Sequence, residues 1–279
     1  MAGDMEQAAG GAAGRPDAGE SAEVGEAGGI SRREFLRRTA AAAAGAAGLA
    51  AIGLIIPDWV RAVEATPPYD WTKHRWVYLI DTYKCIGCGS CVRACKAENN
   101  VADGVYRTWI ERYEIPVEGE AYVDSPDGGL NGFDPVTSGM RVKKAFFVPK
   151  MCNHCAASPC IQVCPVGASY RTEDGAVLVD DKRCIGCGYC VQACPYGSRF
   201  LDPRTHTASK CTWCYHRITK GLKPACVQAC PVGARMFGDR MDPDDPIHEL
   251  LATKRVQVLQ PELLTKPQCF YIGLDEEVR

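Results

Sequence analysis

The stretch Cys184-Ile-Gly-Cys-Gly-Tyr-Cys-Val-Gln-Ala-Cys194-Pro195 decides how this chain folds. It holds four cysteines at the spacing C-x2-C-x2-C-x3-C, and a proline follows the last of them. Its two glycines supply unusual backbone angles, so the loop can aim its first sulfurs at one point. The last two cysteines are one helical turn apart, which puts their sulfurs on one helix face but at different heights. The fourth cysteine therefore points at a different site from the third.

Three further quartets of cysteines occur along the chain. The first has the same spacing, the second is C-x2-C-x4-C-x3-C and the fourth is C-x2-C-x11-C-x3-C. Four quartets use sixteen of the 17 cysteines and leave only Cys269, which we expect to be a small buried apolar side chain. In chain order the quartets are Cys85, Cys88, Cys91 and Cys95; Cys152, Cys155, Cys160 and Cys164; Cys184, Cys187, Cys190 and Cys194; and Cys211, Cys214, Cys226 and Cys230.

Thiolates at these spacings are typical of iron–sulfur clusters. A cubane cluster needs four soft thiolates arranged tetrahedrally around it, and the run with a proline after the fourth cysteine is that of bacterial ferredoxins. Zinc ribbons use two C-x2-C pairs about 15–20 residues apart and lack this tail. A disulfide framework does not explain the paired helical spacing. We therefore predict four [4Fe-4S] clusters, with a zinc-stabilised interaction module as the alternative from another class.

The repeated quartets also predict the fold. Runs with strand character lie at 75–80, 144–148, 175–179 and 234–237, and they alternate with the short cysteine-bearing helices. We expect an α+β fold of tandem two-cluster ferredoxin-like modules over residues 66–240. An insertion at about 101–140 is predicted to hold a hairpin, with a strand at 106–115, and an exposed loop at 116–139 that is either a docking surface or a plain connection. Residues 241–279 form a C-terminal extension whose placement the sequence leaves open.

The first 65 residues have the pattern of an export signal. Ser31-Arg-Arg-Glu-Phe-Leu-Arg-Arg38 is followed by an uncharged Ala/Gly-rich run from Thr39 to Ile56 and by Pro57. The paired arginines before Phe-Leu resemble the twin-arginine signal, with Arg37 where lysine is usual. A cleavage site is predicted after Ala65, and a transmembrane anchor is the alternative. Because twin-arginine substrates resemble one another in crossing the membrane folded, export by this route favours thiolate ligands loaded beforehand over disulfides.

The quartets, the x11 spacing of the last and the Cys152-Asn-His-Cys155 opening of the second resemble the four-cluster iron–sulfur subunits of the dimethyl sulfoxide reductase family. The resemblance covers about Trp76 to Asp239 and implies that the outer quartets combine with each other, as do the inner ones. It implies four ligand sets: Cys85, Cys88, Cys91 and Cys230; Cys211, Cys214, Cys226 and Cys95; Cys152, Cys155, Cys160 and Cys194; and Cys184, Cys187, Cys190 and Cys164.

The sequence contains no site for making or breaking substrate bonds. It has no Gly-rich dinucleotide loop, no phosphate loop and no CxxCH haem motif, and full cysteine ligation leaves no open position on iron. We expect a non-catalytic electron-transfer subunit without a small-molecule substrate of its own. The net charge of −2 gives no indication of nucleic-acid binding.

The resemblance also implies the partners of this subunit. They are a molybdopterin-containing catalytic subunit and a polytopic quinone-reactive membrane subunit, with the chain in the periplasm and held at the membrane through a partner. The alternative within electron transfer is the equivalent subunit of a periplasmic nickel–iron hydrogenase or of a nitrite-reducing quinol pathway.

Several charged or imidazole side chains lie beside the cysteines in sequence. A cation near a cluster raises its potential, because reduction adds negative charge. For each of the six basic neighbours we nevertheless expect a solvated surface charge. We also do not expect His154 to be a ligand, because four thiolates are already available. The six basic residues are Arg93, Lys96, Lys150, Lys182, Arg183 and Lys210.

Overall fold

The computed structural model describes residues 69–135, 139 and 141–278. The predicted signal region, residues 1–65, lies outside this part of the molecule. The described residues form one compact unit. Within the described ranges, no helix is long and apolar enough to span a membrane.

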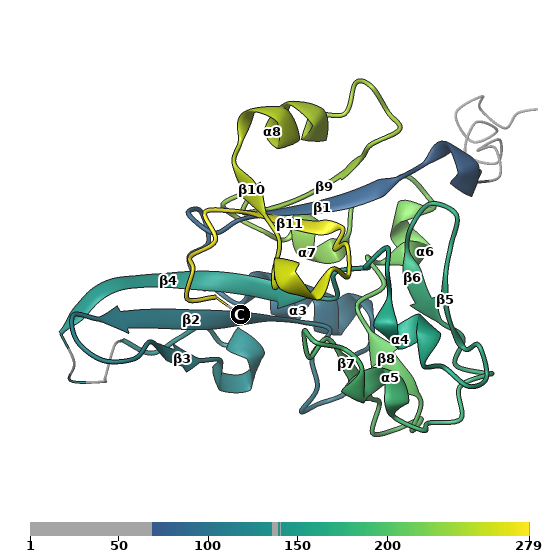
Figure 1. Cartoon of the computed structure of the whole chain (residues 1–279), viewed down its shortest axis with the longest axis horizontal. Helices are drawn as coiled ribbons and strands as arrows, with labels where there is room; N and C mark the ends of the chain where they lie inside the picture. The colour runs from purple at the N-terminus through teal and green to yellow at the C-terminus, as the bar shows by residue number, and fades with distance from the viewer. Residues whose placement is uncertain (1–68, 136–138, 140, 279) are drawn as a thin grey trace, which may run out of the picture. The chain divides into compact units, whose positions relative to one another are not determined.

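A four-stranded sheet runs through this unit in the order β10-β11-β1-β9 (Figure 1). β1 pairs antiparallel with β9 and parallel with β11, so the C-terminal extension adds strands to the same sheet as the start of the module. The strands predicted at 75–80 and 234–237 are thereby confirmed. The bounds are β1 (Trp76–Asp81), β9 (Arg235–Asp239), β10 (Val256–Gln257) and β11 (Cys269–Ile272).

Side chains of β1 are buried on both faces of this sheet. Tyr78 and Ile80 join the core that contains the cysteines, whereas Val77 and Leu79 pack on the other side with Ile247 of helix α8 (Ile247–Thr253). Alternation along the strand places these two pairs on opposite faces. The extension therefore covers the sheet face that points away from the cysteines.

A second sheet, in the order β3-β2-β4, contains the insertion. β2 (Thr108–Pro116) and β4 (Val142–Met151) lie side by side along nearly their whole length (Figure 1), and β3 (Tyr122–Asp124) pairs with β2 as the predicted hairpin. The predicted strands at 106–115 and 144–148 are confirmed. The loop at 116–139 is not exposed throughout: Gly128 and Gly129, in a 3₁₀ turn, are buried.

Short helices and the loops beside them carry the sixteen cysteines of the quartets, and two small hairpins lie between them. Helix α3 packs against α7, and α4 packs against α5, so the helices of the outer quartets meet each other, as do those of the inner quartets. This arrangement is that of two tandem ferredoxin-like modules. β6 confirms the strand predicted at 175–179. The bounds are α3 (Ser90–Glu98), α4 (Pro159–Gln162), α5 (Tyr189–Gln192), α6 (Tyr215–Ile218) and α7 (Ala225–Gln228), with hairpins β5 (Ser169–Arg171)–β6 (Val177–Val179) and β7 (Arg199–Leu201)–β8 (Ala208–Lys210).

Candidate metal centres

The four predicted ligand sets are called groups 1 to 4, in an order that follows their arrangement in the structure described below. Group 1 is Cys85, Cys88, Cys91 and Cys230; group 2 is Cys95, Cys211, Cys214 and Cys226; group 3 is Cys152, Cys155, Cys160 and Cys194; and group 4 is Cys164, Cys184, Cys187 and Cys190. All these cysteines are free thiols in the structure.

The four cysteines of group 1 line one cavity, although Cys230 follows the other three by well over a hundred positions. Its empty space is about 300 Å³, and its other walls are mainly aliphatic side chains and prolines. Three of the thiols come from the loop and first turn of α3, and Cys230 follows the end of α7, which packs on α3.

Group 3 repeats this arrangement in the other module. Its four cysteines line a second cavity with an empty space of about 330 Å³, whose walls combine prolines and Val177 with the polar side chains of Asn153, Ser158 and Arg199. Cys194 follows α5, which packs against the α4 helix that contains Cys160. The outer and inner modules thus each surround a cavity with thiols from two quartets.

The thiols of group 2 are all buried. Burial and then the nearby thiols of Cys226 and Cys214 raise the pKa of Cys95 to about 12. Burial and then Cys95 and Cys226 likewise raise the pKa of Cys211 far above its ordinary value, and Cys152 of group 3 contributes too. Group 2 therefore adjoins group 3.

Group 4 is the most exposed of the four. Cys187 is exposed, and Cys164 and Cys184 are half-buried. Cys190 lies in α5, and Cys164 follows α4, the helix packed against α5. Groups 1 and 2 share helices α3 and α7, groups 3 and 4 share α4 and α5, and group 2 adjoins group 3, so the groups form a row in the order 1-2-3-4. Group 2 is buried, group 3 is partly buried, and groups 1 and 4 reach the surface.

The residues around the groups fit iron–sulfur clusters. Several buried polar atoms there have no hydrogen-bond partner within the described residues: Asn153 Nδ2 and Oδ1, Trp213 Nε1, Arg199 Nε and Nη2, and Arg235 Nε. All of these atoms except Asn153 Oδ1 are donors; unpaired buried donors are costly, and cluster sulfur atoms would accept from them. Backbone N–H groups already donate to cysteine sulfurs, from Trp213 to Cys211 (3.4 Å) and from Ala234 to Cys230 (3.3 Å).

A single-ion site is a different geometry from a cluster site. Among residues 69–135, 139 and 141–278, no three His, Cys, Asp or Glu side chains are placed to hold one metal ion. The thiols of groups 1 and 3 instead line cavities, as a cluster of several atoms requires.

His154 is fully buried, and both of its ring nitrogens form hydrogen bonds within the protein. Its Nδ1 accepts from the Val177 N–H (2.9 Å), so its Nε2–H donates to the Cys211 carbonyl (3.1 Å). Its ring stacks on Trp213, with the ring centres 3.8 Å apart. Burial and the charge of Lys210 hold the pKa of His154 well below its ordinary value, so the imidazole is neutral.

Two of the six basic neighbours contradict the expectation of a solvated charge. Lys150 is buried and forms an ion pair with Glu111 (2.7 Å). Lys210 is buried too, and its Nζ donates to the carbonyl oxygens of Val177 and Cys211. Lys182 and Arg183 are exposed as expected. Lys150 is the second-last residue of β4 and Lys210 is the last residue of β8, and both of these strand ends are buried.

Sequence reasoning missed two buried arginines, Arg199 and Arg235. Each stands five residues after the last cysteine of its quartet, in the pattern Cys-Pro-x-Gly-x-Arg. The recurrence of arginine at this repeat position was the available signal.

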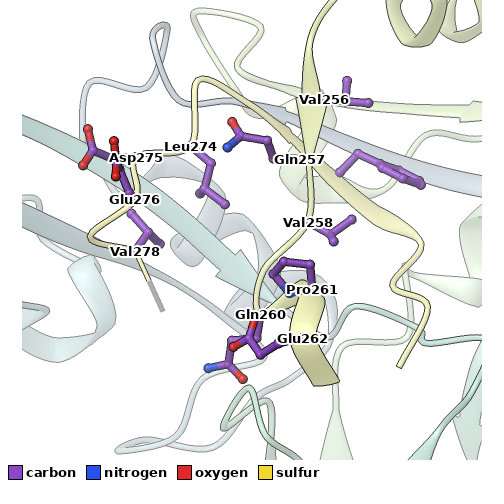
Figure 2. Close-up of a pocket in the computed structure, with 11 residues that line it drawn as sticks. Val256, Gln257, Val258, Gln260, Pro261, Glu262, Leu274, Asp275, Glu276 and Val278 are labelled. Atoms are coloured by element: carbon purple, nitrogen blue, oxygen red, sulfur yellow. The ribbon is translucent and has the colours of Figure 1, made fainter. Parts of the chain in front are cut away.

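A groove elsewhere on the molecule contains no cysteine. It is lined on one side by Val256, Gln257, Val258, Gln260, Pro261 and Glu262, and on the other by Leu274, Asp275, Glu276 and Val278 (Figure 2), with Phe270 completing it. Its ionisable side chains are carboxylates, so the thiolate ligands of a cluster are lacking there.

Comparison with known proteins agrees with this geometry. Two family models described as "4Fe-4S dicluster domain" match residues 84–168 and 143–240, which together include all four quartets. The chain is 41% identical to a tetrathionate reductase subunit of Salmonella typhimurium over 248 residues, 88% of this chain and 89% of the relative. It is 46% identical to a tetrathionate reductase subunit of Archaeoglobus fulgidus over 200 residues, 72% of this chain and 83% of the relative. A polysulfide reductase chain of Wolinella succinogenes is 39% identical over 193 residues (69% and 91%).

Proposed function

Because this protein belongs to the family of iron–sulfur subunits of tetrathionate, polysulfide and related reductases, we propose that it relays electrons between two partners. The partners are a molybdopterin-containing catalytic subunit and a quinone-reactive membrane subunit. The protein is an electron-transfer subunit with four [4Fe-4S] clusters. The observation that carries the proposed placement between two partners is the row of four cysteine groups. A row with a fully buried group 2 and surface-accessible ends suits a protein that accepts electrons at one surface and delivers them at another.

The four groups are the proposed ligand sets. Each cluster, when bound, supplies a one-electron redox centre. The protein holds it with four thiolates, which leaves no open position for a substrate. Burial of group 2 limits the access of water there more than at the exposed group 4. Backbone N–H groups and buried cations beside the sulfurs stabilise their negative charge.

The two ends of the row offer apolar contact surfaces. Ile86, in the loop of group 1, and Ile185, at the equivalent position in group 4, are both exposed. Tyr189 is exposed beside group 4 as well. Exposed apolar side chains around a redox centre suit docking of a partner protein. We assign one end to the catalytic partner and the other to the membrane partner.

The catalytic partner is proposed to act on a sulfur compound of the tetrathionate type. Two of the relatives above are named tetrathionate reductase subunits, and one of them matches almost nine-tenths of both chains. Co-purification from the native host followed by metal analysis tests this proposal. Molybdenum or tungsten in the complex, and reoxidation of the reduced protein by tetrathionate only when the large subunit is present, are expected. Nickel would instead support the hydrogenase alternative.

Export to the periplasm by the twin-arginine route is also proposed, on the sequence of residues 31–57. Replacing Arg32 and Arg33 together by lysine is expected to leave the protein in the cytoplasm with its clusters assembled. Cell fractionation with a twin-arginine-independent periplasmic marker measures this. Unchanged export of the double variant would contradict the proposed route.

A further inference from the structure

Three buried cations lie among the cysteine groups. Arg235 is 2% exposed, Lys210 is 1% exposed and Arg199 is 4% exposed. Within the described part of the molecule, none of the three forms a salt bridge with a carboxylate. An uncompensated buried charge is strongly unfavourable, so a negative group must lie near each of them.

Arg235 lies between groups 1 and 2. It lines the cavity of group 1. Burial lowers its pKa, but Cys91 of group 1, Tyr78 and Cys226 of group 2 more than reverse this and raise it. One nitrogen, Nη2, donates to Thr108 Oγ1 (2.8 Å), while Nε has no partner within the described residues. The guanidinium is thus held in place through Nη2, while the N–H of Nε is free to donate a hydrogen bond.

Arg199 has the equivalent place between groups 3 and 4. It lines the cavity of group 3. Burial lowers its pKa, but Cys160 and Cys152 of group 3 and Cys190 of group 4 together raise it above its ordinary value. Its Nη1 donates to Ser169 Oγ (2.9 Å), and its Nε and Nη2 have no partner among the residues that the structure describes.

Lys210 lies at the remaining junction, between groups 2 and 3. Its Nζ is fixed by the carbonyl oxygens of Val177 and Cys211. Burial lowers the pKa of Lys210, and the sulfurs that act against this and favour its charge are those of Cys152 and Cys160 in group 3 and Cys211 in group 2. Each gap along the row therefore contains one buried cation, and two of the three occupy the same position of the repeat.

We propose that these three cations set the reduction potentials of the redox centres. Each cation acts on the two cysteine groups that flank it. The inference deepens the proposed function and rests on it, because it assumes that the four groups hold clusters. Reduction adds a negative charge to a centre that is already negative, so a fixed cation nearby favours the reduced form. A cation shared by two neighbours also lessens the repulsion between them when both are reduced.

The test uses the full-length protein, purified anaerobically with its clusters, and a redox titration followed by electron paramagnetic resonance. Arg235→Gln is expected to make two of the four clusters harder to reduce, and Arg199→Gln the other two. At a fixed potential the ratio of reduced to oxidised centre should fall about tenfold, which is ~59 mV for one electron. The double variant should shift all four. Lys210→Met should shift one cluster from each of these pairs.

Arg183→Gln is the matched control. Arg183 adjoins Cys184 in sequence, but its side chain is 70% exposed and pairs with Asp180, so solvent screens it. Loss of the Arg183 charge should leave the reduction potentials unchanged, so that the ratio of reduced to oxidised centre at a fixed potential stays within twofold of the parent value. Unchanged potentials in Arg199→Gln and Arg235→Gln, or equal shifts in Arg183→Gln, would overturn the proposal.

Charge-preserving variants cover the case in which a glutamine variant fails to assemble. Arg199→Lys and Arg235→Lys should then retain the iron content and nearly the potentials of the parent protein. If the lysine variants lose their clusters as the glutamine variants do, packing and not charge is the cause, and the proposal fails. The parent protein separates the two claims. Fewer than four clusters in it would contradict the proposed function. Four clusters whose reduction potentials do not change in the variants would contradict only this inference.

Discussion

The sulfur atoms of Cys95 and Cys214, from the first and the last quartet, each lie 3.6 Å from the side-chain nitrogen of Asn99. One amide therefore serves two cysteines that are far apart in sequence, and Arg107 fixes that amide by donating to its oxygen (3.2 Å). The helix that begins the cysteine region and the loop that begins its last quartet meet at this point. This contact places the fourth cysteine of the first quartet beside the last quartet, as the predicted exchange of fourth cysteines requires.

This relationship predicts which cysteine substitutions have the same effect. Cys95→Ser and Cys214→Ser should impair the same cluster and give matching changes in the paramagnetic spectrum. Cys91→Ser, which lies one helical turn before Cys95, should impair a different one. Spectra of the three reduced variants and their double-variant combinations measure this. If Cys91→Ser and Cys95→Ser affect one cluster together, the exchange of fourth cysteines between quartets is wrong.

The insertion packs tightly on the loop of group 1, which predicts a large effect at Gly89. This residue has a positive φ of 74°, and a Cβ there would collide with the carbonyl oxygens of Gly129 and Leu130. We expect Gly89→Ala to displace the insertion or the loop and to lose about one cluster of iron, with a fall in melting temperature.

Gly188→Ala is the control at the same position of the third quartet. Its φ is 76°, but a Cβ there would meet nothing within 4 Å. Only the cost of the left-handed backbone remains, about 1–2 kcal/mol. Iron content should be unchanged in this variant. Equal losses in the two variants would show that backbone angle, and not the insertion, limits the first loop.

His154→Phe should retain all four clusters and lose stability. A phenyl ring can keep the stacking on Trp213, but the buried Val177 N–H loses its acceptor, whereas the Cys211 carbonyl keeps Lys210 as a donor. The expected cost is about 1–3 kcal/mol in the free energy of unfolding. Anaerobic denaturation together with iron analysis measures it. A variant of normal stability that lacks one cluster would make His154 a ligand.

Much of this architecture follows from the cysteine spacing, because a cluster demands four thiolates at fixed separation and the helical x3 step separates the last two. The cysteines of groups 1 and 3 meet around cavities as the pairing of outer and inner quartets requires. Cys269 is fully buried in β11, as predicted for an apolar role.

The cations were predictable only in part. Burial depends on which neighbours cover a strand end, so Lys150 and Lys210 have the sequence pattern of surface charges and nevertheless lie in the core once the protein is folded. The placement of β11 beside β1 was similarly beyond the sequence, because a short apolar run does not specify which distant strand it joins. Its parallel pairing depends on tertiary contacts.

The central claim, that sixteen cysteines hold four redox clusters, is tested most directly by counting iron, acid-labile sulfide and unpaired spins in one anaerobic preparation of the protein. We predict about sixteen iron atoms and about sixteen sulfides per molecule, and four one-electron centres on full reduction. A folded protein that contains zinc and no iron, or about eight irons with its other cysteines in disulfides, would contradict the account.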